Sequence, residues 1–438
     1  MVFAPPVAVA ELGSDVHFYV NFQTRVHEDI NRVAQAMEGL RDVEYLPEPS
    51  DRRIVSAVDP TVIGFQDQWR SETMGWAPLT VEPVVHQRPR RFSISGLVVF
   101  ALLVSASLLM WQNQWLVVEL PLPESEWAFE DTELRDVQAS GLSGEGVRVC
   151  MVDTGMEADH DAFSGIEVEF KDFVGISREP TDYGAVAHGT LMAGLLLSQD
   201  DHQLGSAPNV SFAMVAALAD NGDGENTGLD SDVADAIRWC QFEFNADIIS
   251  LSLGGTEGTD GSEGGSSAAT RQATDAGIYV VAAAGNDGQN DDGDVASPSS
   301  VRLAISVAAS DRDGGTWANS SVGSDVDRDG AVRQHPHMKP EVSAPGVRII
   351  SAGSDNLWYS SSGTSDATVF VTGALALVLE QHPMLKPQPN GNASCLIKVK
   401  EALMESMQDG DVDHNNRSGY GFLNAQAWLD KTAQITSC

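Results

Sequence analysis

Short apolar runs alternate with helical stretches between residues 147 and 309, and this alternation is what most constrains the fold of the chain. The apolar runs lie at residues 147–153, 210–218, 246–253, 278–284 and 303–309, and helical stretches at 232–244 and 266–276 separate several of them. Strands that alternate with helices form parallel sheets through right-handed crossovers, with helices on both faces. We therefore predict an α/β fold whose functional residues lie at the carboxyl ends of the strands.

Four polar residues stand where such a sheet would place chemistry. Asp153 ends the first apolar run and Asn286 follows the fourth, while His188 and Ser365 each begin a helical stretch. Any one of them is explained by helix capping. Together they supply a hydroxyl, an imidazole to take its proton, a carboxylate to orient the imidazole and a carboxamide to stabilise an oxyanion. The set therefore favours a nucleophilic site over four independent caps.

Local strings around these residues extend the pattern. They read "DTG" at Asp153, "HGT" at His188, "AAAGN" at Asn286 and "GTS" at Ser365. Supporting strings in the same order are "SLSLGG" at 250–255, "KPEVSAPGVRIIS" at 339–351 and "GYGFLNA" at 419–425. From about residue 142 to residue 429 the chain resembles the subtilisin-like serine peptidases. The resemblance implies a subtilisin-like domain, with a parallel sheet covered by helices, over residues 141–438.

The resemblance implies a serine endopeptidase that acts on polypeptides and needs no cofactor for its chemistry. Ser365 would be the nucleophile, His188 the general base and then acid, and Asp153 the residue that orients His188. Asn286 and the backbone N–H of Ser365 would hold the oxyanion. The residues implied for substrate binding are Ser252, Leu253, Gly254, Gly255, Ala284 and Gly285. An α/β-hydrolase esterase is disfavoured, because no G-x-S-x-G string surrounds Ser365 and the serine comes last.

Asp366 departs from the family pattern, in which methionine usually follows the nucleophile. Leu191 and Val369 depart as well, at positions without a catalytic role in the family. A carboxylate about 6 Å from the oxyanion would oppose it by roughly 3 kcal/mol, as much as one oxyanion-hole donor contributes. We expect Asp366 to point away from Ser365 Oγ, as a helix N-terminus permits, or activity to be low. The alternative function is a weakly active or silent binding protein on the same fold at the cell surface.

Residues 92–118 carry no charge and are long enough to cross a bilayer. Arg88, Arg90 and Arg91 precede this stretch and several glutamates follow it, which places the N-terminus in the cytoplasm and the peptidase domain outside. A core helix and a late, cleaved signal peptide are the alternatives. We predict a single transmembrane helix that anchors the chain in the cell membrane, followed by a spacer over residues 119–140.

Residues 1–91 are predicted to form a small cytoplasmic α+β module and a linker. A strand-like run at 16–22, an apolar helical stripe at 26–40 and two further apolar runs favour a β-α-β unit over about residues 15–58. The unit resembles a family prodomain, yet the predicted topology puts it across the membrane from the peptidase domain. A partner-binding role and a plain folded stub are the two other interpretations.

The net charge of −37, with only six lysines, argues against nucleic acid and anionic lipid as partners. An acidic, lysine-poor surface suits high salt, where self-repulsion is screened. We interpret this composition as that of a protein from a saline or marine host, with an archaeon as the favoured source. An acidic surface that serves solubility alone is the alternative. The sequence leaves the natural substrate, the primary specificity and the oligomeric state open.

Four cysteines, Cys150, Cys240, Cys395 and Cys438, all follow the uncharged stretch. An extracellular domain permits disulfides, for which three connectivities exist. We favour a Cys395–Cys438 pair. The alternative is four reduced thiols, and for Cys150, which sits in a predicted strand, a buried thiol is common.

The string "DVDRDG" at 325–330 has the spacing of a calcium loop, with Asp325, Asp327 and Asp329 as ligands. Residues 409–416 are a looser, oxygen-rich second candidate. Because subtilisin-like enzymes often bind structural Ca²⁺, the resemblance raises this expectation. A solvated acidic turn is the alternative in so acidic a chain.

Overall fold

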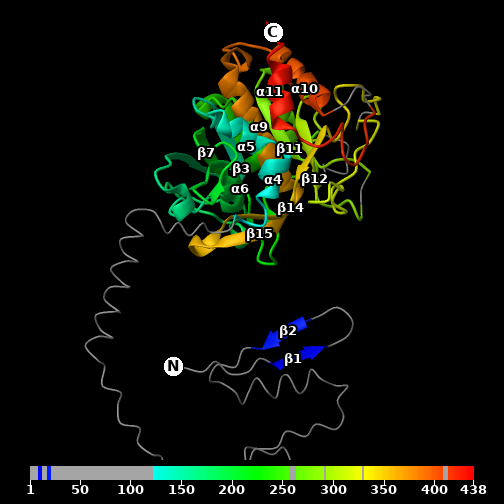
Figure 1. The fold of residues 1–438 in the computed structure, drawn as a ribbon. Helices are drawn as coiled ribbons and strands as arrows, with labels where there is room; N and C mark the ends of the chain where they lie inside the picture. The colour runs from blue at the N-terminus through cyan, green and yellow to red at the C-terminus, as the bar shows by residue number, and fades with distance from the viewer. Residues whose placement is uncertain are drawn as a thin grey trace, which may run out of the picture. The chain divides into compact units, whose positions relative to one another are not determined.

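The computed structural model describes residues 8–11, 17–20, 122–255, 263–290, 293–327, 330–407 and 413–438 (Figure 1). It divides the chain into two compact units, residues 1–116 and 117–438. In the first unit β1 (Ala8–Glu11) pairs antiparallel with β2 (His17–Val20). β2 lies within the run at 16–22 that the sequence analysis predicts to be a strand. The remainder of the predicted β-α-β unit lies outside the described residues.

The stretch predicted to cross the membrane, residues 92–118, also lies outside the described residues. Of the helices that the structure does describe, none has the length and apolar character that a bilayer span requires. The membrane anchor therefore stays a prediction.

The second unit is organised around a seven-stranded sheet with the strand order β13-β12-β11-β10-β3-β7-β4. Its strands are β3 (Arg148–Asp153), β4 (Val168–Asp172), β7 (Ser211–Ala216), β10 (Ile248–Leu251), β11 (Tyr279–Ala283), β12 (Ile305–Ser310) and β13 (Val342–Pro345). Every neighbouring pair runs parallel. All five predicted runs form strands of this sheet, so the predicted α/β fold with a large parallel sheet is confirmed.

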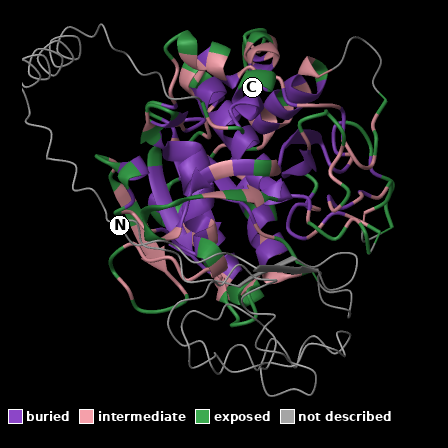
Figure 2. Cartoon of the chain, turned by 60° about the horizontal axis from the view of Figure 1, so that its bottom comes forward, coloured by how far each residue is buried: buried purple, intermediate pink, exposed green. Residues whose placement is uncertain are grey.

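Side chains along each strand alternate between two hydrophobic cores, one on each face of the sheet. Met151 of β3 belongs to the core that contains α6 (His188–Leu197) and α9 (Thr364–Gln381). Its neighbour Val152 belongs to the core that contains α7 (Asp230–Trp239) and α8 (Gly265–Asp275). Figure 2 shows the sheet and the helices around it as the buried interior of this unit. Helices thus cover both faces, as predicted.

Shorter elements complete the second unit. The helices α4 (Trp127–Asp131), α5 (Leu134–Ala139), α10 (Ser394–Ser406) and α11 (Ala425–Thr432) gather around α9, as Figure 1 shows. The antiparallel pairs are β14 (Val347–Ala352) with β15 (Trp358–Ser362), β5 (Gln199–Asp200) with β6 (Gln203–Leu204), and β8 (Ala219–Asp220) with β9 (Asn226–Thr227). One turn of π-helix, Cys240–Phe244, continues α7.

The structure differs from the spacer predicted over residues 119–140. α4 and α5 lie in this stretch, and Trp127, Phe129, Leu134 and Val137 are buried in the core that contains α9. The Phe129 ring meets the Phe370 ring of α9 edge to face, with 4.8 Å between centroids. The prolines and glutamates of this stretch favoured a spacer in the prediction from sequence. The apolar side chains of the same stretch pack into the core instead.

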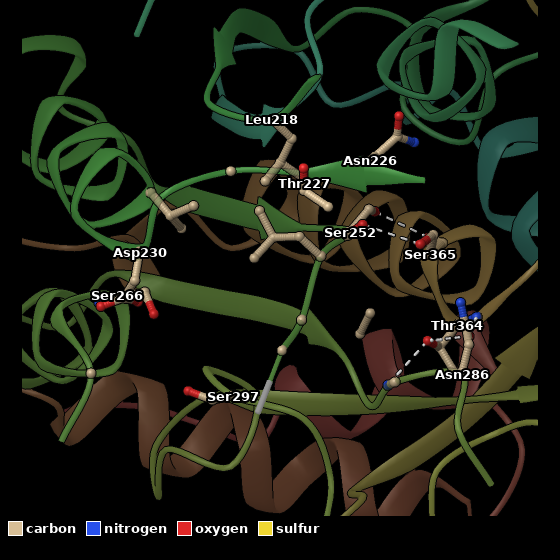
Figure 3. Close-up of a pocket in the computed structure, with 18 of the residues that line it drawn as sticks. Leu218, Asn226, Thr227, Asp230, Ser252, Ser266, Asn286, Ser297, Thr364 and Ser365 are labelled. Atoms are coloured by element: carbon tan, nitrogen blue, oxygen red, sulfur yellow. Dashed lines mark hydrogen bonds between the residues drawn. The ribbon is translucent and has the colours of Figure 1, made fainter. Parts of the chain in front are cut away.

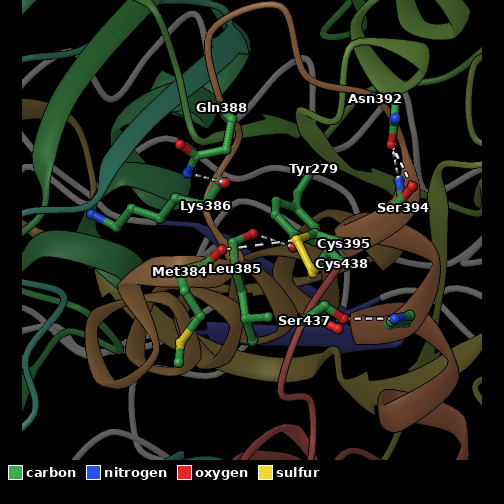
Figure 4. Close-up of a disulfide and its surroundings, with 11 residues drawn as sticks. Tyr279, Met384, Leu385, Lys386, Gln388, Asn392, Ser394, Cys395, Ser437 and Cys438 are labelled. Atoms are coloured by element: carbon green, nitrogen blue, oxygen red, sulfur yellow. Dashed lines mark hydrogen bonds between the residues drawn. A yellow bond between two sulfur atoms is a disulfide. The ribbon is translucent and has the colours of Figure 1, made fainter.

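Two disulfides link distant parts of the second unit. Cys150 in β3 joins Cys240, which follows α7, and Cys395 in α10 joins the C-terminal Cys438 (Figure 4). The Cα–Cα distances of 5.7 and 4.9 Å lie within the usual range. The predicted Cys395–Cys438 pair is confirmed, and Cys150 is not the free thiol that was its alternative.

Replacement of both Cys150 and Cys240 by alanine should lower the free energy of unfolding by about 2–4 kcal/mol. The disulfide spans 90 residues, so its loss gives the unfolded chain a large gain in conformational entropy. The matched variant Cys395→Ala/Cys438→Ala opens a span of 43 residues and should lose less. Urea denaturation without reductant measures both, and a first variant as stable as the wild type would contradict this account.

Candidate active site

The structure brings the four predicted residues to the carboxyl edge of the sheet. Asp153 is the last residue of β3, and Asn286 follows β11. His188 is the first residue of α6, and Ser365 lies in the first turn of α9. His188, Asn286 and Ser365 line one cleft of about 1040 Å³ (Figure 3), and Asp153 is fully buried against His188. All four residues therefore lie at strand ends or helix starts, where the sequence pattern put them.

A short hydrogen bond joins the imidazole to the carboxylate. His188 Nδ1 lies 2.7 Å from Asp153 Oδ1, which also accepts the Thr154 N–H at 2.7 Å. Because Nδ1 faces the carboxylate, Nε2 is the ring nitrogen that remains for proton exchange. Asp153 Oδ2 is buried and accepts no hydrogen bond from the part of the chain that the structure describes. The bond to His188 is thus the one side-chain hydrogen bond that the described residues provide to this carboxylate.

Three carboxylates act on the His188 imidazole. Burial of the ring lowers the pKa of His188, but the charge and hydrogen bond of Asp153, with the charges of Asp366 and Asp182, outweigh this effect. The pKa of His188 is thereby raised from 6.5 to about 9. A protonated imidazole cannot accept a proton from a hydroxyl, so the raised pKa moves the reactive, neutral form of His188 to higher pH.

Asp182, which was not singled out from the sequence, links the "DTG" segment at Asp153 to the "HGT" segment at His188. Its Oδ1 accepts the Thr154 hydroxyl at 2.6 Å, and its Oδ2 accepts the N–H and the hydroxyl of Thr190 at 2.8 and 2.7 Å. Thr154 follows Asp153 and Thr190 lies two residues after His188, so one carboxylate fixes the end of β3 against the start of α6. Asp182 is one of 63 acidic residues, and nothing in its local sequence distinguishes it from the others.

The backbone immediately before His188 is strained. Val186 and Ala187 have φ angles of 50° and 53°, in the left-handed region that costs a residue with a Cβ atom about 1–2 kcal/mol. The Ala185 N–H donates to Asn226 Oδ1 at 2.7 Å, which holds this turn from outside. Such strain persists where the surrounding contacts fix it. Here the turn lets α6 begin with His188 directed at its carboxylate.

The Ser365 hydroxyl is bonded to the segment that follows β10. Ser365 Oγ donates to the Ser252 carbonyl oxygen at 3.1 Å, and Ser252 Oγ donates to the Ser365 carbonyl oxygen at 3.2 Å. Among the contacts of the described residues, no hydrogen bond joins Ser365 Oγ to His188. Rotation about the Cα–Cβ bond moves Oγ between staggered positions, and catalytic hydrogen bonds often form only with substrate bound. Proton transfer to His188 requires that rotation.

Two N–H donors converge beside Gly363, at the start of α9. Asn286 Nδ2 and Ser365 N lie 3.4 and 3.6 Å from the position that a Cβ atom on Gly363 would occupy. Asn286 Oδ1 accepts the N–H and the hydroxyl of Thr364, both at 2.9 Å, which fixes the orientation of the amide. Donors that converge in this way can stabilise the oxyanion of a tetrahedral intermediate.

Two backbone segments form the walls of the cleft. Their lining residues are Ser252, Leu253, Gly254 and Gly255 on one segment, and Ala283 and Gly285 on the other. Gly255 and Ser297 exchange backbone hydrogen bonds of 3.0 and 2.9 Å, which hold the first wall in place. Ala284, predicted to bind substrate, is instead fully buried, and its N–H donates to the Val307 carbonyl oxygen. Ala283 takes its place at the cleft.

The sequence model described as "Subtilase family" matches residues 144–422. The chain belongs to the subtilase family. It is 34% identical to subtilisin DY of Bacillus licheniformis, over 57% of this chain and 82% of that protein. It is 31% identical to serine protease AprX of Bacillus subtilis (strain 168), over 68% and 70% of the two chains, and 34% identical to thermitase of Thermoactinomyces vulgaris, over 54% and 76%. This subtilase is therefore a serine peptidase that hydrolyses peptide bonds.

In this subtilase the carboxylate of Asp366 is buried beside the two N–H donors. The side chain is 1% exposed, and the Ser361 hydroxyl of β15 donates to its Oδ1. Its Oδ2 lies 3.7 Å from the same position beside Gly363 that Asn286 Nδ2 and Ser365 N approach. Burial raises the pKa of Asp366 to about 7, although the Ser361 hydrogen bond and the nearby imidazole oppose the rise. The prediction that Asp366 points away from Ser365 Oγ, or that activity is low, stays a prediction: one carboxylate oxygen is bonded to Ser361, and the other lies on the side of Gly363.

The predicted calcium loop is described only in part. Asp329 lies outside the described residues, as does half of the second candidate at 409–416. Asp327 Oδ1 accepts the Ala331 N–H at 2.8 Å within the turn, whereas Asp325 Oδ1 accepts Asn416 Nδ2 at 3.2 Å from a distant segment. Within the described ranges, no three acidic, histidine or cysteine side chains gather as a metal site requires. Calcium binding therefore stays a prediction.

The kcat/KM of this subtilase should rise with pH along an acid limb centred near the His188 pKa of about 9. The imidazole has to be neutral to accept a proton, and its raised pKa keeps it protonated below that pH. Below the limb, kcat/KM should fall about tenfold per pH unit. Initial rates on a chromogenic peptide from about pH 6 to about pH 11 measure the profile. A plateau already reached at neutral pH would show that the carboxylates do not act on the imidazole in this way.

Proposed function

We propose that this subtilase is a membrane-anchored serine endopeptidase whose catalytic domain lies outside the cytoplasm. Asp153, His188 and Ser365 form its catalytic triad, and Asn286 belongs to its oxyanion hole. The observation that carries the proposal is the 2.7 Å bond between His188 and Asp153 in a site whose cleft also contains Ser365 and Asn286. Membership of the subtilase family supports polypeptides as the substrate class.

Acylation begins when the Ser365 side chain turns from the Ser252 carbonyl toward His188 Nε2. Ser365 Oγ attacks the scissile carbonyl carbon while its proton passes to His188, and Asp153 stabilises the imidazolium. The carbonyl oxygen becomes an oxyanion that accepts hydrogen bonds from Asn286 Nδ2 and Ser365 N. His188 gives its proton to the leaving amine. A water molecule then repeats these steps on the acyl-enzyme, which releases the acid and restores Ser365.

The cleft wall from Ser252 to Gly254 follows directly after β10, where it presents backbone groups to the cleft. An extended peptide that binds there as an added strand would be held by main-chain hydrogen bonds. A Cβ atom on Gly254 would lie 2.7 Å from the Ala296 Cβ atom, so glycine at this position lets the wall pack closely against its neighbouring segment. This arrangement suits an endopeptidase, because it requires no free chain end.

The Ser365→Ala variant should lose labelling by a fluorophosphonate probe and should lose at least about 10³-fold in kcat/KM. The probe reacts with a serine that a neutral imidazole activates, so the assay is made above the His188 pKa of about 9. Ser362→Ala is the matched control, because this exposed hydroxyl accepts the Arg348 N–H at 2.8 Å and should not be needed for labelling. A wild-type protein that stays unlabelled would reject the triad.

A weakly active or silent binding protein on the same fold is the second candidate function. The observation that favours it is the Asp366 carboxylate, which lies beside both N–H donors. The hydrogen bond between Asp153 and His188 favours the enzyme. Probe labelling above the His188 pKa distinguishes the two, because a silent protein stays unlabelled at every pH.

Two independent features support a location of the catalytic domain outside the cytoplasm. The uncharged stretch at 92–118 has arginines on its N-terminal side, which orients a spanning helix with its C-terminal end outside. Both disulfides of the second unit are of the kind that oxidising compartments maintain. The net charge of −37 further suits saline surroundings, where its repulsion is screened.

The full-length protein should remain in the membrane pellet through an alkaline carbonate wash. A matched variant, Leu103→Asp/Leu108→Asp, should be released or fail to insert, because each charge near the bilayer centre costs about 2.5–3.5 kcal/mol. Immunoblotting of pellet and supernatant measures the distribution. Release of the wild type into the supernatant would exclude the anchor.

Structural Ca²⁺ at residues 325–330 would stabilise the folded state in proportion to its occupancy. Addition of a chelator such as EGTA should then lower the Tm by roughly 5 °C. The variant Asp325→Asn/Asp327→Asn should show a lower Tm without chelator and no further shift with it. An unchanged wild-type Tm would remove calcium from the account.

A further inference from the structure

A buried acid that the triad mechanism does not use, Asp366, lies near the two N–H groups assigned to the oxyanion hole. We propose that Asp366 is a built-in electrostatic restraint, whose buried carboxylate opposes the oxyanion that forms near Asn286 Nδ2 and Ser365 N. This proposal rests on the proposed function, since it concerns the charges that develop during acyl transfer. It assigns the residue after the nucleophile a role in setting both the rate and the pH range of the peptidase.

The position of the carboxylate relative to the oxyanion donors is the first support. Asn286 Nδ2, Ser365 N and Asp366 Oδ2 all lie within 3.7 Å of one point, the place of a Cβ atom on Gly363. In the proposed mechanism the two N–H groups donate to the oxyanion, and the Asp366 carboxylate places a second negative charge near the same point. With the side chain 1% exposed, water cannot screen this charge effectively.

A hydrogen bond keeps the carboxylate in this place. The Ser361 hydroxyl, on β15, donates to Asp366 Oδ1, which leaves Oδ2 on the side of Gly363. β15 pairs with β14, so the donor belongs to a hydrogen-bonded element and not to a loose loop. The bond stabilises the ionised form of Asp366, against the burial that disfavours it.

The charges around the imidazole are the second support. Asp153 at the end of β3, Asp182 in the loop before α6 and Asp366 on α9 all raise the pKa of His188. Asp153 and Asp182 also hold the geometry of the triad through the hydrogen bonds described above. Asp366 makes no hydrogen bond to the ring among the contacts of the described residues, so its effect on His188 is one of charge. The imidazole is in turn the charged group that acts on Asp366.

The restraint operates over the whole range in which the enzyme works. Acyl transfer needs a neutral His188, whose pKa is raised to about 9, while Asp366 has a pKa raised only to about 7. A pH high enough to free the imidazole of its proton therefore leaves Asp366 ionised. The carboxylate then opposes the oxyanion in each turnover.

Asp366→Asn removes the charge while keeping the shape and an oxygen that accepts the Ser361 hydroxyl. We expect kcat on a peptide substrate to rise about tenfold with little change in KM, because the oxyanion exists in the transition state and not in bound substrate. The acid limb of kcat/KM should move to lower pH. A peptide boronic acid, which forms an anionic tetrahedral adduct, should bind about tenfold more tightly.

Asp201→Asn is the matched control, because it removes the same charge from an exposed turn between β5 and β6. It should leave kcat, the acid limb and boronate binding as in the wild type. Thermal unfolding of both variants shows whether they fold.

Ser361→Ala supplies the same test without changing Asp366, should the Asn variant not fold. Loss of the donor raises the Asp366 pKa further, so kcat should rise between about pH 7 and pH 9 and return to the wild-type value at higher pH. If the wild type is active and Asp366→Asn has the same kcat, acid limb and boronate affinity, the restraint is overturned while the triad stands. Wild type and Asp366→Asn both inert to the fluorophosphonate probe would overturn the triad and the restraint together.

Discussion

The backbone pairing of β3 with β10 on one side and β7 on the other controls where the chemistry of this subtilase lies. Asp153 ends that strand, and the disulfide from Cys150 to Cys240 ties the same strand to the far face of the sheet. The carboxylate is therefore fixed in space by hydrogen bonds along a whole strand. α6 and α9 pack on one face of the sheet, so His188 and Ser365 are carried to the same edge by a shared core.

Positively charged side chains are buried inside the second unit, although the chain as a whole is strongly acidic. Two of only six lysines, Lys339 and Lys400, are fully buried around Glu341, with Nζ to Oε1 distances of 2.9 and 2.5 Å. Both ammonium groups also donate to the Ala304 carbonyl oxygen, at 2.7 and 3.0 Å. Desolvation makes such a cluster costly unless its partners are well placed. Ion pairs in this cluster join α10 to the segment before β13, and hydrogen bonds to residues 304 and 306 join both to β12. The active site, in contrast, has several carboxylates around one imidazole.

What the sequence reveals about the site follows from how narrowly the chemistry restricts residue types. Asp153, His188 and Ser365 stand in short glycine-flanked strings, so their strand ends and helix starts were predictable. Asp182 was not, because its role arises from contacts with two threonines that the fold brings to it. Asp366 was recognisable as unusual, but its burial depends on how β15 packs over the start of α9. The strands of the large sheet could also be predicted, because fully buried strands appear in the sequence as uninterrupted apolar runs.

The packing of α4 and α5 has a consequence for any shortened form of the catalytic domain. The Ile350 N–H of β14 donates to Ser125 Oγ at 3.1 Å, and the Ala425 N–H that opens α11 donates to the Thr132 carbonyl oxygen at 2.8 Å. A protease that cut near residue 140, where the family resemblance begins, would remove Trp127 and Phe129 from beside α9, the helix that bears Ser365. A shortened form that keeps this packing around α9 therefore has to retain the residues from Ser125 onward.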